Sequence, residues 1–209
     1  MDGRFCVIAD VQLSKLSATM ILEPSLLHGV HVRLEPLRPD HRAEMQTTLQ
    51  SDPANWELQS ISALGPHFEN YWRMMTEMPR RITLAAFDQA SARMAGTSSF
   101  FDIDPKHKTL EVGYTWFRPD YRGTGINAET KLLMLSQAFD AGALRIQFSV
   151  SAANRRSQAA VLKLGAKKEG VLRRHKITWT GANRDTVLFS IIAEEWEEVR
   201  ENLKRGLGQ

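Results

Sequence analysis

A chain of 209 residues is long enough to bury the core of one domain, and its 43% hydrophobic and 24% charged content is ordinary for a globular protein. No apolar run approaches the roughly 20 residues of a membrane span, so no membrane partner is expected. The net charge of +3 is too small to indicate nucleic-acid binding by itself. The single cysteine, Cys6, excludes an internal disulfide and fits a reducing, cytoplasmic setting. The six histidines show no metal-ligand spacing, so no metal is expected.

The N-terminal end lacks the regular pattern of the rest of the chain. Residues 1–23 are predicted to form a loosely held extension, and residues 24–209 to form a single domain. Residues 5–8 are too short an apolar run for a secretory signal. Met20 begins the more orderly segment, which raises the hypothesis that translation can start there.

Hydrophobic periodicity divides the first part of the domain into one strand and two helices. Residues 30–37 alternate apolar and polar side chains, which predicts a half-buried strand. Helices are predicted at residues 39–49 and 66–75, each beginning near a proline. One face of the second helix is apolar and is assigned to the core: Phe68, Tyr71, Trp72 and Met75. Trp56 lies between the two helices and is assigned either to the core or to a substrate mouth.

Six further strands and three helices are predicted in the remainder of the chain. The strands are expected at residues 82–87, 94–101, 110–117, 145–150, 167–177 and 186–192, with a turn at 180–183. The helices are expected at residues 128–141, 155–164 and 194–203, and Asn154 is a good N-cap for the second of them. This order predicts an antiparallel meander followed by one parallel crossover. A doubly wound dinucleotide-binding fold would instead alternate strand and helix throughout.

A glycine-containing turn at residues 121–127 joins a predicted strand to a predicted helix. Such a turn presents free backbone N–H groups and the positive end of a helix dipole, which suits a phosphate. Gly123 and Gly125 permit a close approach of the ligand, and Arg122 adds a cation. The turn lacks the Gly-Lys-Ser/Thr of an NTPase loop, so that loop is excluded. A dinucleotide fingerprint has a third glycine, or an alanine, where this chain has Ala128, so the turn alone does not exclude that fingerprint. The alternative interpretation is an ordinary tight turn.

Positive charge is concentrated just downstream of this turn. Residues 155–176 contain eight Lys or Arg but only one acid, Glu169. The excess suits a small polyanion, although a solvated basic face explains it equally well.

Two signatures in this order resemble those of the GNAT acetyltransferase superfamily, and the chain is most similar to its RimJ/RimL-like branch over residues 24–200. The superfamily loop is Arg/Gln-x-x-Gly-x-Gly/Ala; Arg122 and Gly125 match it, and Asn127 replaces the last small residue. The second signature, Asn-x-x-Ser/Ala followed by Leu-Gly, is matched by Asn154, Ser157, Leu164 and Gly165. The resemblance implies a mixed α/β fold with a mostly antiparallel sheet of six to seven strands, a β-bulge that splays two strands apart, and flanking helices.

The resemblance also implies acetyl-CoA as the acyl donor. Its pyrophosphate is expected on the backbone of Arg122, Gly123, Thr124, Gly125, Ile126 and Asn127. Its pantetheine arm is expected to run like an added strand beside Thr115, Trp116 and Phe117, and to reach Asn154 and Ser157. No metal is implied.

Acyl transfer to an amine requires removal of a proton, stabilisation of an oxyanion and departure of a thiolate. The resemblance places Glu111 where related enzymes carry a catalytic glutamate, acting directly or through water; a simple strand-end carboxylate is the alternative. Ser157 and Asn154 are the other candidate catalytic residues, and Ser157 is expected to hydrogen-bond the departing sulfur. Many superfamily members have a tyrosine where this chain has Val161, so it is open whether any general acid is used.

The expected function is therefore an acetyl-CoA-dependent N-acetyltransferase that acts on a primary amine by direct transfer in a ternary complex. The acceptor is a protein N-terminal α-amine or a small-molecule amine. A CoA-binding regulatory module with weak turnover is the alternative, because of Val161 and Asn127. Nucleic acid is not expected as a partner, and a homodimer stays open.

Overall fold

The structure is a computed structural model that describes residues 19–209. Most of the predicted extension, including Cys6, lies outside the described residues. Met20 belongs to the described part and is only 2% exposed, in the main hydrophobic core. No helix among residues 19–209 combines the length and the apolar character needed to cross a membrane.

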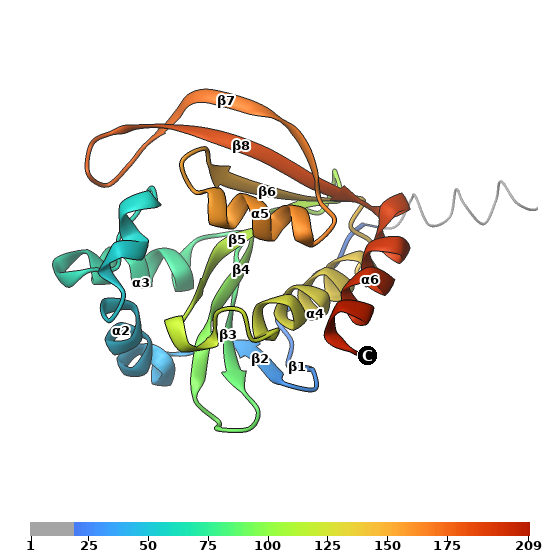
Figure 1. The fold of residues 1–209 in the computed structure, drawn as a ribbon, viewed down its shortest axis with the longest axis horizontal. Helices are drawn as coiled ribbons and strands as arrows, with labels where there is room; N and C mark the ends of the chain where they lie inside the picture. The colour runs from blue at the N-terminus through green and yellow to red at the C-terminus, as the bar shows by residue number, and fades with distance from the viewer. Residues whose placement is uncertain (1–18) are drawn as a thin grey trace, which may run out of the picture.

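One eight-stranded sheet organises the described residues, in the order β1-β2-β3-β4-β5-β6-β8-β7 (Figure 1). Neighbouring strands are antiparallel except β5 and β6, which are parallel. The strands are β1 (Leu27–His28), β2 (Val32–Pro36), β3 (Ile82–Asp88), β4 (Met94–Asp104), β5 (Thr109–Phe117), β6 (Arg145–Ser151), β7 (Lys167–Ile177) and β8 (Asn183–Ile192). The predicted meander and single parallel crossover are confirmed.

The sheet has one strand more than the six to seven expected, because the two-residue strand β1 pairs with β2 at its edge. Val30, predicted to begin an inward-facing strand, is 63% exposed because it lies in the turn between β1 and β2. A buried carboxylate holds this turn: Glu129 accepts hydrogen bonds from the N–H groups of Val30 (2.7 Å), His31 (2.8 Å) and Val32 (2.8 Å).

The helices are α2 (Arg42–Gln50), α3 (Phe68–Glu77), α4 (Ile126–Asp140), α5 (Arg155–Lys163) and α6 (Ala193–Leu207). Short 3-10 turns occur at η1 (Pro39–His41), η2 (Pro53–Leu58), η3 (Gly65–His67) and η4 (Pro119–Tyr121), each with a proline in its first positions. Proline suits these positions because its missing N–H would have no partner in the turn.

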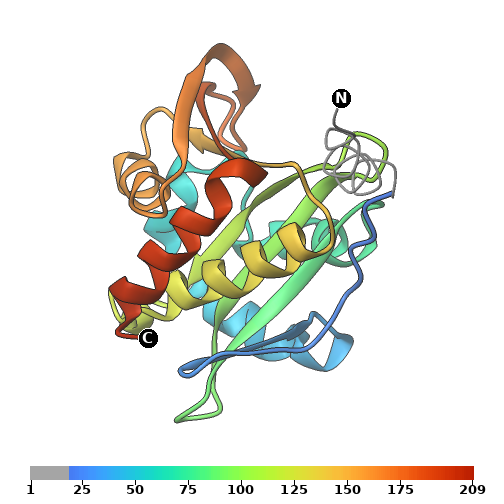
Figure 2. The same ribbon diagram turned by 90° about the vertical axis from the view of Figure 1, so that its right-hand side faces the viewer.

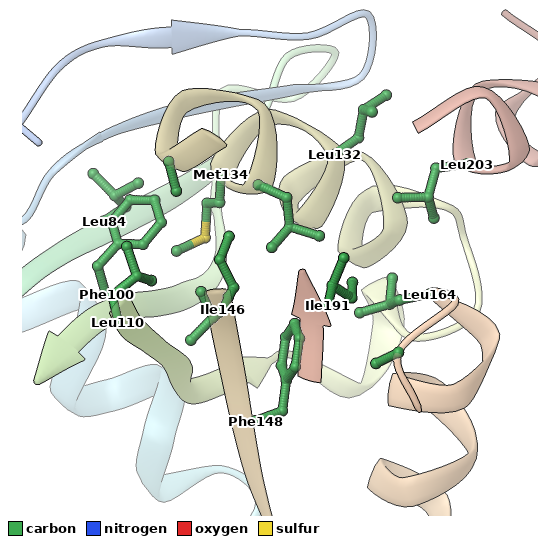
Figure 3. Packing of buried hydrophobic residues seen from close by; sticks show 14 of the residues in the cluster. Leu84, Phe100, Leu110, Leu132, Met134, Ile146, Phe148, Leu164, Ile191 and Leu203 are labelled. Carbon is green, nitrogen blue, oxygen red and sulfur yellow. The ribbon is translucent and has the colours of Figure 1, made fainter. Parts of the chain in front are cut away.

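Helices cover both faces of the sheet. Helices α4 and α6 lie side by side on one face (Figure 2), and Figure 3 shows the core beneath them, built from α4, α6, Leu164 and strands β3, β4, β5, β6 and β8. Helices α2 and α3 pack on the other face with Trp56, Tyr71 and the other predicted aromatic core residues. Along β3, Leu84 and Ala86 belong to the first core whereas Ala85 and Phe87 belong to the second, as expected when successive side chains alternate between faces. Trp56 is 2% exposed, which assigns it to the core.

Candidate functional site

The two halves of the sheet separate next to β5. Strands β5 and β6 pair only through Thr109, Leu110 and Glu111. In the pairing of β4 with β5, Ser99 faces Gly113 and Thr97 faces Trp116, so two residues of β5 oppose the single residue Ser98. A bulge of this kind bends the strand and disrupts pairing. The edge of β5 that faces β6 is therefore free of a strand partner beyond Glu111, which confirms the predicted bulge and splay.

The bulge has a backbone conformation that is unusual for a bulky residue. Tyr114 has φ of +47°, in the left-handed region. Its ring contacts the guanidinium of Arg81, at 4.2 Å from the ring centroid, and the ring of Phe101, at 4.9 Å between centroids in a T-shaped arrangement. These contacts hold the Tyr114 side chain in place at the bulge.

A cavity of about 340 Å³ opens where the strands separate. Most of the predicted site residues line it, namely Glu111, Thr115, Trp116, Phe117, Arg122, Gly123, Asn127, Asn154 and Ser157. Thr124, Gly125 and Ile126 belong to the same loop but do not line the cavity. The structure thus brings residues from β5, the glycine turn and the start of α5 around one space.

The glycine turn provides backbone donors at one end of this cavity. Gly123 has φ of +81° and Gly125, the N-cap of α4, has φ of +90°, so both need the conformational freedom of glycine. No described residue accepts a hydrogen bond from the N–H groups of Gly123, Thr124 or Gly125. A side-chain atom added at Gly123 would meet nothing within 4 Å, which leaves room for a ligand. Free N–H groups at a helix start form an anion site.

The side chain of Arg122 turns away from this loop. Its Nε donates to the carbonyl of Phe117 (3.0 Å), and its guanidinium forms an ion pair with Asp52. Its positive charge is therefore already matched by a carboxylate of the chain. Asn127, which departs from the superfamily pattern, lines the cavity with a buried Oδ1 that has no partner among the described residues.

Asn154 and Ser157 lie at the start of α5, where the helix dipole is positive. The Oδ1 atom of Asn154 accepts a hydrogen bond from the N–H of Ser157 (3.0 Å), as predicted for an N-cap. No described residue accepts a hydrogen bond from the Asn154 Nδ2 or from the Ser157 hydroxyl, so both groups are available to a ligand in the cavity.

Glu111 occupies the last residue pair between β5 and β6, opposite Gln147. The Nε2 of Gln147 donates to Oε2 of Glu111 (3.1 Å), so an amide rather than a cation holds this carboxylate. The carboxylate is half-buried at the cavity wall, a position from which it can accept a proton. Val161, at the place of the superfamily tyrosine, also lines the cavity.

Two buried cations of this cavity were missed by sequence reasoning. Lys131 on α4 is 5% exposed, and its Nζ donates to the hydroxyls of Ser98 (2.7 Å) and Thr115 (2.5 Å). Burial lowers the pKa of Lys131 to about 7. The sequence feature that could have placed Lys131 at the cavity is its spacing from Asn127. Lys131 follows Asn127 by four residues, so both lie on the same face of the helix.

The second missed cation is Arg184, which is 9% exposed and lines the cavity from β8. Burial lowers the pKa of Arg184, and the interactions with Tyr114 and Glu111 oppose this effect. The predicted turn ends at residue 183 and the predicted strand begins at residue 186, so Arg184 was assigned to neither, whereas β8 begins at Asn183.

The tip of the β7–β8 hairpin lies close to η2 and η3, the two short turns that precede α3 (Figure 1). The Nε1 of Trp179 donates to the carbonyl of Trp56 (2.8 Å), and the Trp179 ring meets the His67 ring at 5.4 Å. These contacts connect the β7–β8 hairpin to η2 and η3.

Comparisons with known proteins agree with this geometry. A family model described as an acetyltransferase (GNAT) domain matches residues 31–167. A crystal structure from T. thermophilus, described as an acetyltransferase, is 34% identical, with a TM-score of 0.82 over 90% of this chain and 100% of that one. The uncharacterized N-acetyltransferase YoaA of Bacillus subtilis (strain 168) is 34% identical over 100 residues, which are 47% of this chain and 55% of that relative.

A more distant structure shares the fold alone. Mycobacterium smegmatis RimJ, in complex with CoA-disulfide, is 20% identical, with a TM-score of 0.74 over 88% of this chain and 95% of that one. The family model covers well over half of the sequence and includes the bulged strand, the glycine turn and the start of α5. The chain therefore belongs to the GNAT acetyltransferase domain family.

Proposed function

We propose that the protein is an acetyl-CoA-dependent N-acetyltransferase that acetylates a primary amine by direct transfer. The observation that carries this proposal is the free edge of β5 beside the unpartnered N–H groups of the glycine turn, at one cavity. The pantetheine arm of CoA contains two amides that can pair with a strand edge, and its pyrophosphate suits the turn. The solved structure of RimJ, a fold neighbour, is a complex with CoA-disulfide, which supports this assignment.

In this proposal the residues of β5 and the glycine turn bind the donor. Thr115, Trp116 and Phe117 offer backbone groups to the pantetheine arm, and Gly123 to Asn127 offer N–H groups to the pyrophosphate. The Nδ2 of Asn154 is free to bind a pantetheine carbonyl or a water molecule. The Arg122 side chain holds the turn in place through Asp52 rather than contacting phosphate itself.

The chemical step follows from the same arrangement. Glu111 takes a proton from the acceptor ammonium, directly or through water, and the amine nitrogen attacks the thioester carbonyl. A backbone N–H near Trp116 stabilises the oxyanion. Collapse of the intermediate forms the amide and expels the CoA thiolate, which takes the second proton from the attacking nitrogen to give free CoA thiol. The Ser157 hydroxyl donates a hydrogen bond to the departing sulfur. A thiolate is a good leaving group, so the absence of a tyrosine at Val161 does not prevent turnover.

The RimJ/RimL likeness favours a protein N-terminal α-amine as acceptor, and a small-molecule amine is the other candidate. Release of free thiol from acetyl-CoA with a panel of peptides and small amines tests the activity, and calorimetry with CoA tests donor binding. We expect binding in either case and amine-dependent release with at least one acceptor class. Binding without release on any amine would favour a CoA-binding regulatory module, the alternative suggested by Val161 and Asn127. Absence of binding would contradict both.

A further inference from the structure

Resting on the proposed acetyltransferase function, we propose that the acceptor amine carries a carboxylate, and that Arg184 with Lys176 binds this carboxylate inside the cavity.

The first reason is the state of the Arg184 guanidinium. It is nine-tenths buried, its Nε is fully buried without a hydrogen-bond acceptor, and no carboxylate among residues 19–209 forms an ion pair with it. Burying a cation without a partner is costly, whereas a guanidinium that faces a ligand space can recover this cost by binding an anion. The planar fork of arginine matches a carboxylate with two parallel hydrogen bonds.

The second reason is the strand register. Lys176 on β7 is the direct cross-strand partner of Arg184 on β8, and both residues line the cavity. Like charges placed opposite each other in an antiparallel pair are destabilising. An anion bound between the two side chains would be attracted by both and would offset their mutual repulsion.

The third reason is the charge of the cavity wall as a whole. Glu111 is the only acidic residue that lines the cavity in the described part of the chain, whereas the lining includes Arg122, Arg156, Lys176 and Arg184. Arg122 is paired with Asp52, but the cationic excess remains. Such a wall repels polycationic amines and favours an acceptor that brings its own negative charge.

Arg184 and the proposed base, Glu111, line the same cavity. The carboxylate of Glu111 is close enough to Arg184 to raise the pKa of the guanidinium against the lowering effect of burial. A carboxylate bound at Arg184 would therefore lie on the acceptor side, near Glu111, and the amine of the same molecule would be directed toward that base. Tyr114 and Phe101 also line the cavity and offer an apolar wall to the rest of the acceptor.

Matched pairs of acceptors test this inference. One arm uses free amino acids and their α-amides, which differ only in the α-carboxylate. The other arm uses amidated peptides beginning with Asp or Glu and with Asn or Gln, which differ only in a side-chain carboxylate. We measure kcat/KM by thiol release, and we measure acceptor affinity for the CoA-saturated protein by calorimetry. In at least one arm we expect the carboxylate member to be favoured by about 10- to 100-fold, because hydrogen bonds to charged groups contribute about that much.

Three variants identify the residue responsible. Arg184→Gln is expected to abolish the carboxylate preference, and Lys176→Gln, which keeps the more buried cation, is expected to weaken it. Arg173→Gln is the control, because Arg173 is an exposed cation on β7 outside the cavity lining. Circular dichroism checks that each variant is folded.

The possible outcomes separate this inference from the proposed function. Equal use of both members of every pair would overturn the inference while leaving acetyl transfer intact, as would an unchanged preference in Arg184→Gln. An equal loss of acetyl-CoA affinity in Arg184→Gln would assign the site to a CoA phosphate and would also overturn it. If no amine supports thiol release, the proposed function fails. In that case calorimetry still tests the inference, which is overturned if carboxylated amines do not bind the CoA-saturated protein.

Discussion

Replacement of the buried lysine of the cavity, Lys131→Met, is expected to stabilise the protein near neutral pH. Methionine has a similar length and shape but no charge. The two hydrogen-bond partners of Lys131, the hydroxyls of Ser98 and Thr115, lie 2.8 Å from each other and can bond mutually once the ammonium is gone. The substitution therefore removes a buried charge without leaving a buried polar group unsatisfied.

The magnitude follows from the pKa shift. Burial lowers the pKa of Lys131 from 10.5 to about 7, which is worth about 5 kcal/mol at about 1.4 kcal/mol per pH unit. Between these two values the unfolded state binds a proton that the native state does not, so the free energy of unfolding of the wild type rises with pH in this window. The penalty is complete below about pH 7. Two lost hydrogen bonds offset it by about 2 kcal/mol, so a net gain of about 3 kcal/mol is expected for Lys131→Met at pH 7.

Denaturant unfolding at pH 7, 8 and 9 measures this effect. The difference between Lys131→Met and the wild type should shrink as the pH rises, because only the wild type gains stability. Lys163→Met is the control, since Lys163 is exposed on α5 and its removal should give no pH-dependent difference. A Lys131→Met variant that is less stable than the wild type at pH 7, or a difference that is constant across the range, would refute the reasoning.

Three further outcomes are expected. Glu111→Gln should lower kcat and leave the Kd for acetyl-CoA unchanged; equal turnover at every pH would remove Glu111 from the mechanism. Gly125→Trp should abolish CoA binding in calorimetry, because φ of +90° strains any other residue and a large side chain blocks the turn; retained affinity would contradict the loop assignment. Burial alone would raise the pKa of Glu129, but backbone hydrogen bonds from residues 30–32 lower it below its usual value. Glu129→Gln should therefore cost about 3 kcal/mol at pH 7. The contribution of Glu129 is complete above about pH 4.5 and is lost as the pH falls through its lowered pKa, so the difference in unfolding free energy should disappear in acid. The exposed Glu201→Gln serves as control, and an equal loss in both variants would contradict this role.

Local signals predicted most of the fold. Alternation located the seven longer strands, prolines located the starts of the segments that contain α2 and α3, and the N-cap Asn154 located the first residue of α5. The error at Val30 has a non-local cause. The turn before β2 is held by the carboxylate of Glu129, which is 98 residues away from His31 in the chain, and no local pattern encodes that contact.

The candidate site was predicted only in part, for a related reason. The glycine turn and the start of α5 depend on residues close together in sequence, so their geometry could be anticipated. The ion pair of Arg122 with Asp52 joins residues 70 apart, and it changes the expected role of the arginine from ligand contact to support. The burial of Lys131 and Arg184 likewise depends on packing between distant elements, whereas a lysine or arginine in sequence is by default a surface residue.

The bulge at Tyr114 connects the stability of the sheet to its function. By disrupting regular pairing it leaves β5 and β6 joined through only three residue pairs, so the sheet gives up backbone hydrogen bonds that a continuous sheet would make. Other contacts compensate: α4 packs against α6 on one face, and Trp179 joins the β7–β8 hairpin to Trp56 across the gap. The strand edge exposed in this way is the one that can pair with the amides of a pantetheine arm. In the proposed function, a CoA bound there would supply the pairing that the chain does not, so the same irregularity that weakens the sheet would create the donor site.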